Sequence, residues 1–305
     1  MRQRVATICG FLLVGAVFVS GCGSDGGGGE RSLNDQLQEA RAVEDPAQRT
    51  DALIEVAKKY VKAADTMGAR DCLRDGTKAA EEISVEEQAA ERAQAYINLA
   101  EGWLAAGDKR SCEDAYEAAE DALDHVDDAT TKTERLIDLA LLKIKVDDKS
   151  DAARDLKSAE ERTAEIADSF VRVEMLGWVA YGHNQMDDKD EAGRVMNSAK
   201  TLAESQEAPG DKARLLSLVG REQISSLGDQ EAGLATLAAA ADIARSIQDN
   251  AYLQASVLVG VAHDYLKADQ KDKTRELLNE AQEICEGRSE CKPVMGKIEE
   301  VRGKL

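Results

Sequence analysis

Four cysteines in the body of the chain are the first residues whose chemistry the sequence singles out. Cys285 and Cys291 flank Gly287 across the expected end of a helix, so a disulfide between them would join that helix to the segment after it. Cys72 and Cys112 lie on two expected neighbouring helices and form a second candidate pair, with free buried thiols as the alternative. The C-x-x-C and Cys/His spacings of metal sites do not occur. We therefore predict no metal and no cofactor.

The histidines and acidic residues indicate no catalytic constellation. None of the three histidines has a second histidine four residues further on: His125, His183 and His263. Asp187–Glu191 resembles the start of a calcium-binding loop, but its sixth position is Ala192 where that loop needs glycine. A helix N-cap explains this acidic turn better. No Ser–His–Asp or paired-carboxylate pattern stands out, so we predict a protein without intrinsic catalysis.

The first thirty residues have the composition of an export signal. Arg2 and Arg4 give a basic start, and Val5–Val19 is an apolar stretch shorter than the ~20 residues that span a bilayer as a helix. The segment Val19-Ser20-Gly21-Cys22 follows, and then a glycine-rich run that lacks hydrophobic periodicity. We predict a signal peptide over residues 1–21 and a tether over residues 22–30.

This N-terminal pattern resembles the lipobox of bacterial lipoproteins. The resemblance implies that the chain is cut before Cys22, that the Cys22 thiol is lipidated and that the new N-terminus is acylated, which anchors the protein durably. Gly23 follows the cysteine instead of aspartate. By the same resemblance this favours the outer membrane, facing the periplasm, although the sequence alone does not decide between the inner and outer membranes.

A unit of about 40 residues repeats along the rest of the chain. Its marker is a small residue in the first helix, spaced by 40 to 43 positions: Ala57, Ala100, Ala140, Ala180, Gly220 and Ala262. Three residues beyond each marker comes a position that is aromatic in three copies, and after it an Asp- or Gly-containing turn. A second helix then carries a small, a large and a small residue, as in Cys112, Tyr116 and Ala119. Small residues at crossing points allow two helices to approach closely.

The order of small and aromatic positions resembles the tetratricopeptide repeat, in six copies over residues 49–287. The resemblance implies an all-α hairpin solenoid, although the period exceeds the usual 34 residues. Residues 31–48 and 288–305 are expected to be capping helices at its two ends. Asp45, Asp128, Asp168 and Asp249 precede first helices and are expected to be N-caps.

The resemblance also implies a concave face lined by the first helices. Its early positions are apolar, as in Ile54, Ile97 and Ile137, and are either exposed in a groove or buried by tight packing. Later positions are polar and are the candidate partner-binding residues: Tyr181, Asn184, Gln185, Arg214, Arg221 and His263. Such a groove would suit a peptide with an acidic end.

Composition limits the classes of partner. The chain carries a formal charge of −20, which disfavours binding to nucleic acid. Only 3 of its 305 residues are proline, as a nearly continuous succession of helices requires. We predict a lipid-anchored scaffold that binds another envelope protein or peptide. The alternatives are a passive envelope spacer or oligomer and an enzyme that uses carboxylates on the concave face.

Overall fold

A computed structural model describes residues 31–305, which contain helices and no strand. The predicted signal peptide, the lipidation site at Cys22 and the tether lie outside the described residues. Residues 33–305 form one compact unit. Among the described helices, none combines the length and the apolar character that a membrane crossing requires.

Six helical hairpins make up most of this unit, and the predicted all-α hairpin solenoid is confirmed. The pairs are α3 (Pro46–Lys62) with α4 (Thr66–Glu81), α5 (Val85–Ala105) with α6 (Lys109–Leu123), α7 (Ala129–Lys145) with α8 (Lys149–Thr163), α9 (Ser169–Gln185) with α10 (Lys189–Glu204), α11 (Pro209–Ser225) with α12 (Gln230–Arg245), and α13 (Ala251–Lys267) with α14 (Lys271–Cys285). Helix α2 (Leu33–Arg41) packs on α3 at one end. At the other end a 3-10 turn, η1 (Ser289–Cys291), leads to α15 (Lys292–Arg302), which packs on α13 and α14.

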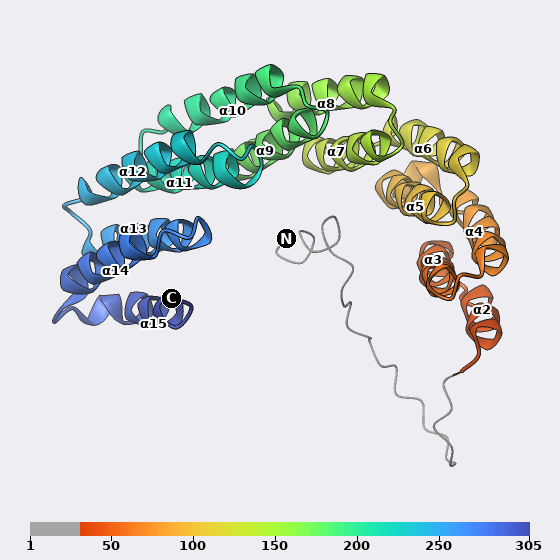
Figure 1. Cartoon of the computed structure of the whole chain (residues 1–305), viewed down its shortest axis with the longest axis horizontal. Helices are drawn as coiled ribbons and strands as arrows, with labels where there is room; N and C mark the ends of the chain where they lie inside the picture. The colour runs from red at the N-terminus through yellow and green to blue at the C-terminus, as the bar shows by residue number, and fades with distance from the viewer. Residues whose placement is uncertain (1–30) are drawn as a thin grey trace, which may run out of the picture. The chain divides into compact units, whose positions relative to one another are not determined.

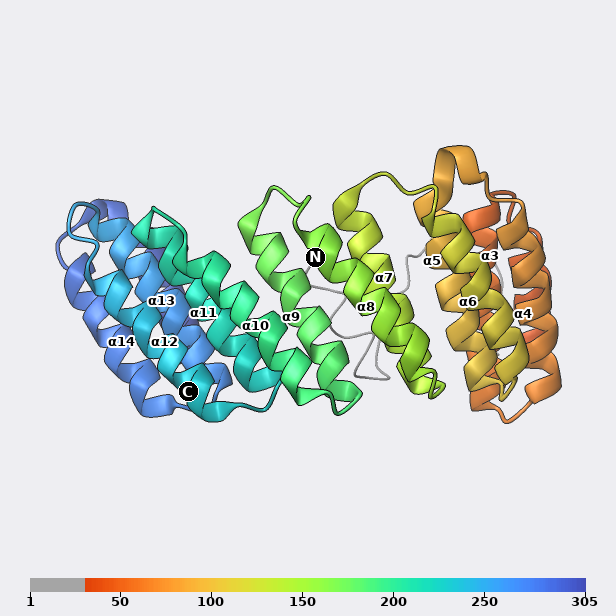
Figure 2. The ribbon, with the colours of Figure 1, turned by 90° about the horizontal axis from the view of Figure 1, so that it is seen from above.

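The hairpins bend into a curved row with their first helices on the inner side (Figure 1). Each of α3, α5, α7, α9 and α11 packs against the first helix of the next hairpin. The second helices follow one another on the outer side in a row of roughly parallel helices (Figure 2). This arrangement of paired helices defines the class of protein as an α-hairpin solenoid of the tetratricopeptide type.

The turn of each hairpin contains two residues with different structural roles. The first has a positive φ, at which glycine is least strained. Two turns have glycine there, Gly107 and Gly228. Other turns have a non-glycine residue, such as Ala64 with φ 59° and Asp187 with φ 66°. The next residue is an aspartate that caps the second helix in five of the six turns. In the acidic turn at Asp187, for example, Asp188 accepts a hydrogen bond from the Glu191 amide at 3.3 Å. The N-cap interpretation of this turn is therefore confirmed.

The junctions between hairpins use the same capping chemistry with one difference from the expectation. Asp45, Asp128 and Asp168 cap α3, α7 and α9 through their carboxylates. Asp249 was expected to cap α13, but that prediction is wrong. The cap is Asn250, whose Oδ1 accepts from the Leu253 amide at 2.9 Å. Asparagine caps as well as aspartate does, so residue type alone could not choose between these neighbours.

The repeated small residues lie where the two helices of each hairpin cross. All six markers of the first helices are buried. In the last hairpin the Thr274 hydroxyl donates to the Ala262 carbonyl at 3.3 Å, across the crossing. In the fifth hairpin a methyl group added to Gly233 would lie 2.7 Å from the Gly220 carbonyl oxygen. The helix backbones thus approach too closely for larger residues at these points.

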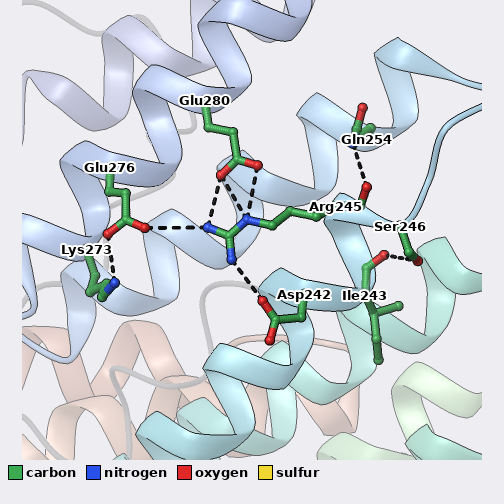
Figure 3. Close-up of polar contacts among 8 residues, drawn as sticks. All are labelled: Asp242, Ile243, Arg245, Ser246, Gln254, Lys273, Glu276 and Glu280. Atoms are coloured by element: carbon green, nitrogen blue, oxygen red, sulfur yellow. Dashed lines mark hydrogen bonds and ion pairs between the residues drawn. The ribbon is translucent and has the colours of Figure 1, made fainter.

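Ion pairs join the outer helices of neighbouring hairpins. Arg245 at the end of α12 contacts both carboxylate oxygens of Glu280 on α14 through its Nε at 3.1 Å, and Asp242 through Nη1 at 2.9 Å (Figure 3). Arg194 on α10 donates through Nη1 to Glu160 Oε1 on α8 at 2.9 Å. These side chains keep partial solvent contact, so each pair contributes little alone. Together they hold the outer helices in register.

One hairpin has an ion pair where three others have an aromatic residue. Lys143 occupies the position of Tyr60, Trp103 and Tyr265, and its side chain is fully buried. Its ammonium donates to Asp155 on α8 at 2.7 Å and to Glu120 on α6 at 2.5 Å. Burial lowers the pKa of Lys143, but these two hydrogen bonds outweigh burial and leave the pKa raised. The lysine is therefore charged and compensated.

We predict that Lys143→Met lowers the free energy of unfolding by about 3 kcal/mol, because the buried Asp155 carboxylate then loses the cation that is hydrogen-bonded to it. The double variant Lys143→Met/Asp155→Leu should recover most of this loss. Urea denaturation followed by circular dichroism at pH 7 measures both. Lys145→Met is the matched control, because the exposed Lys145 only pairs with Glu101 at the surface, and its effect should stay below about 1 kcal/mol. A double variant as unstable as Lys143→Met would contradict the prediction.

Candidate protein-binding face

The inner side of the row, where the first helices pack on one another, is the surface that the sequence analysis singles out. Its apolar positions do not form an open groove. Ile54, Ile97, Ile137 and Leu141 are at most 6% exposed, so neighbouring helices cover them. Of the two interpretations of these residues, the structure supports tight packing. Val61, Leu104 and Ile144 near the helix ends remain partly exposed.

The predicted binding residues of α9 lie at the C-terminal half of that helix. Tyr181 is partly buried and its ring packs edge-on against Trp178, with 5.7 Å between ring centres. Asn184 donates to the carbonyl of Ser226 at 2.9 Å and so joins the end of α9 to the end of α11. Gln185 is exposed. Trp178 is not among the predicted binding residues, although its spacing of three residues from Tyr181 places both on one helix face.

The predicted arginines of α11 are both paired with acids. Arg214 is exposed and lies 3.9 Å from Asp211 in the first turn of its own helix. Arg221 contacts Glu222 Oε1 through Nη2 at 2.8 Å and lies 3.9 Å from Asp264 on α13. Both arginines therefore have acidic neighbours, and the binding of an acidic peptide end to them stays a prediction.

Hydrogen bonds fix the acids around Arg221. Ser217 on α11 donates to Asp264 at 2.8 Å, and Ser226 donates to Glu222 at 2.8 Å. Burial raises the pKa of Asp264 although Arg221 and Ser217 oppose it, and burial also raises the pKa of Glu174 on α9. His263, the predicted binding residue beside Asp264, is partly buried. This cluster connects three successive first helices.

A second group of acids on α7 continues the cluster. Arg135 is almost fully buried and donates to Asp138 at 3.3 Å, with Glu134 3.8 Å away, and its Nε has no hydrogen-bond partner. Burial raises the pKa of Asp138 to about 6, although Arg135 lowers it. Burial raises the pKa of Glu174, which the charge of Arg221 lowers and the charges of Glu222 and Glu134 raise further. We call the five acids Glu134, Asp138, Glu174, Glu222 and Asp264 the inner acidic cluster.

The inner acidic cluster combines five carboxyl groups with the guanidinium groups of Arg135 and Arg221, and the charge of Lys267 also acts on Asp264. Sequence reasoning overlooked these acids because they are scattered among 59 acidic residues. Glu222 and Asp264 are distinguished only by their burial between helices, which sequence spacing does not report. In the described part of the chain no three metal-binding side chains converge.

The predicted cysteine sites fall into two cases. Cys72 and Cys112 are fully buried within their own hairpins, and their helices α4 and α6 do not form a packed pair. Burial raises the pKa of both thiols to about 11. The structure does not bring these two cysteines together. Cys285 and Cys291, by contrast, lie close to one another in the C-terminal cap, where burial and the neighbouring Cys291 raise the pKa of Cys285. All four thiols are free in the structure.

Comparisons with known proteins show no family model that matches the chain and no curated protein that is similar to it. Solved structures give distant likenesses. Ton1535 from Thermococcus onnurineus NA1 has 15% identity and a TM-score of 0.34, and the match covers 87% of this chain and 83% of that one. A Rap protein complexed with competence and sporulation factor has 16% identity and a TM-score of 0.33, with 84% and 81% covered. The quorum sensor NprR from B. thuringiensis has 12% identity and a TM-score of 0.34, with 89% and 75% covered. Likeness at this level carries no inference about partner or activity.

We predict that Asp138 makes folding stability fall as the pH rises from about 4 to about 6. Its pKa is about 6 in the folded chain and near 3.8 when exposed, so the folded chain binds more protons than the unfolded chain between these values. Asp138→Asn should raise the free energy of unfolding at pH 7 by about 1–2 kcal/mol, because it removes a carboxylate whose charged form is disfavoured by burial. The gain stays this small because some solvent still reaches the carboxylate and screens its charge.

Urea denaturation of the variant and the parent at pH 4.5 and pH 7 measures this difference, and NMR titration of the Asp138 carboxyl measures its pKa directly. Asp190→Asn, on the exposed surface of α10, is the matched control and should not alter the pH dependence. Titration of Asp138 near its ordinary value would contradict the prediction.

Proposed function

We propose that this protein is a non-catalytic scaffold that binds a protein or peptide along its inner face and is held at a bacterial membrane by lipid on Cys22. The solenoid supports the first part of the proposal, because stacked hairpins create an extended surface for a partner. The lipobox-like sequence Val19-Ser20-Gly21-Cys22 supports the second part. By resemblance, Gly23 after the cysteine favours the outer membrane, with the scaffold facing the periplasm.

The observation that carries the proposal is the combination of acids and aromatic rings on α9 and its neighbours. Glu174, Trp178 and Tyr181 follow one another at helical spacing and therefore share a face of α9. The inner acidic cluster adds negative charge on α7, α11 and α13. Aromatic rings and carboxylates both attract lysine and arginine side chains. We therefore propose a basic segment as the partner, in place of the acidic one expected from the sequence.

We predict that a ten-lysine peptide quenches the fluorescence of Trp178 saturably and that salt weakens this binding. The variant Trp103→Phe removes the only other tryptophan and makes the signal specific. In that background Glu174→Lys should weaken binding by about fivefold or more, because it reverses a charge beside the rings.

Glu161→Lys is the matched control, since it changes the net charge equally but lies exposed on the outer helix α8. Equal losses in both variants would mean that the peptide responds only to the total charge, and the inner-face proposal would fail. Preference for a ten-glutamate peptide would restore the interpretation drawn from the sequence. Absence of binding to either peptide would favour a passive spacer.

The anchor has its own prediction. Cys22→Ala should accumulate as an unprocessed precursor, because the thiol that carries the lipid is missing and the lipoprotein pathway cuts the chain only after lipidation. Cell fractionation with immunoblotting, together with metabolic labelling by a fatty acid, measures processing and acylation. Ser20→Ala, which keeps a small residue two positions before Cys22, is the control and should be processed normally. A Cys22→Ala protein that is processed normally and released as a soluble product would exclude lipid anchoring at this residue.

A further inference from the structure

The C-terminal cap is held to the last hairpin by a short connection with a defined course. Helix α14 ends at Cys285, and the amide of Arg288 donates to the Cys285 carbonyl at 3.1 Å. The amide of Cys291 then donates to the Arg288 carbonyl at 3.2 Å. Gly287 between them has φ +71°, which glycine adopts without strain. Two successive tight turns therefore return the chain, so that Cys291 lies beside Cys285.

The two thiols are enclosed together. Cys285 and Cys291 are 3% and 0% exposed, and they lie close to one another. The cap beyond them is small: α15 has eleven residues and buries Val294, Ile298 and Val301 against α13 and α14. A helix of this length is marginal without such packing. The connection that carries Cys291 therefore decides how firmly the cap is attached.

We propose that Cys285 and Cys291 form a disulfide that staples the C-terminal cap to the last hairpin. One thiol, as its thiolate, attacks a disulfide of an oxidant such as oxidised glutathione or a disulfide-donating protein, and its proton goes to solvent. The second thiol then displaces the oxidant from this mixed disulfide. One S–S bond forms in the chain and one breaks in the oxidant, which receives two electrons and two protons.

Burial affects how readily the disulfide forms and which cysteines can take part in it. In the folded chain, burial and the neighbouring Cys291 raise the pKa of Cys285 to about 12, which disfavours the reactive thiolate. Once the cap is packed, burial therefore slows both the formation of the bond and its attack by reductants. Cys72 and Cys112 are equally buried but lie in separate hairpins, so they serve as internal controls.

Peptide mapping of the full chain tests the bond directly. Trypsin cuts after Arg288, between the two cysteines, so the disulfide would link peptide 276–288 to peptide 289–297. After folding with oxidised and reduced glutathione, blocking of free thiols and digestion without reductant, we expect this linked pair, with Cys72 and Cys112 blocked. Cys291→Ser should abolish the linked pair and Cys112→Ala should not. Separate blocking of Cys285 and Cys291, or a link to Cys72 or Cys112, would overturn the proposal.

Hydrogen exchange in the full chain tests the stapling. Reduction should speed the exchange of the α15 amides by about tenfold or more, whereas the amides of α7 and α8 should not respond. Cys112→Ala should show the same response to reduction as the parent. Unchanged exchange in α15 after reduction would overturn the stapling. These outcomes do not depend on whether a basic peptide binds the inner face.

Discussion

The close crossing of two helices at small residues is the constraint on which the rest of the structure depends. Where Gly220 meets Gly233, backbone atoms lie too close for even one added methyl group. The other hairpins place alanine, cysteine or threonine at the same point, as in Ala140 and Ala152. Because large residues cannot occupy the crossing, they fill the spaces on either side of it. The spacing of small and large residues is thereby fixed in every copy, and so is the surface that each hairpin offers to the next one.

Much of this fold could be predicted from the sequence because the information is local. A small residue, a large one three positions later and an aspartate in the turn lie within one hairpin, and each has a direct physical effect. Two features could not be predicted from this pattern. Ile97 and Ile137 have the spacing of groove residues, but contact with the neighbouring first helices buries them. Asp249 and Asn250 differ too little as caps for sequence to choose between them.

The candidate site was only partly predictable for the same reason. Tyr181 and Arg221 were found because they break the apolar pattern of the first helices. The partners of Arg221 are Glu222, its neighbour in sequence, and Asp264, 43 positions away on another helix. Only the packing of α11 on α13 reveals the second of these. The acids around Arg221 are therefore apparent only in the structure, and they are the reason why the proposed partner is basic instead of acidic.

Lys143 has a consequence for how such an array can evolve. Repeats whose interfaces consist of alanine, leucine and an aromatic ring can pack beside many other repeats, because such apolar interfaces are not specific for one neighbour. The third hairpin is different, because its lysine needs Asp155 from its own second helix and Glu120 from the hairpin before it. The interface between the second and third hairpins therefore requires an acidic residue at the position of Glu120. Duplication or shuffling of hairpins across this interface would separate the charges, so the buried lysine preserves the order of the copies.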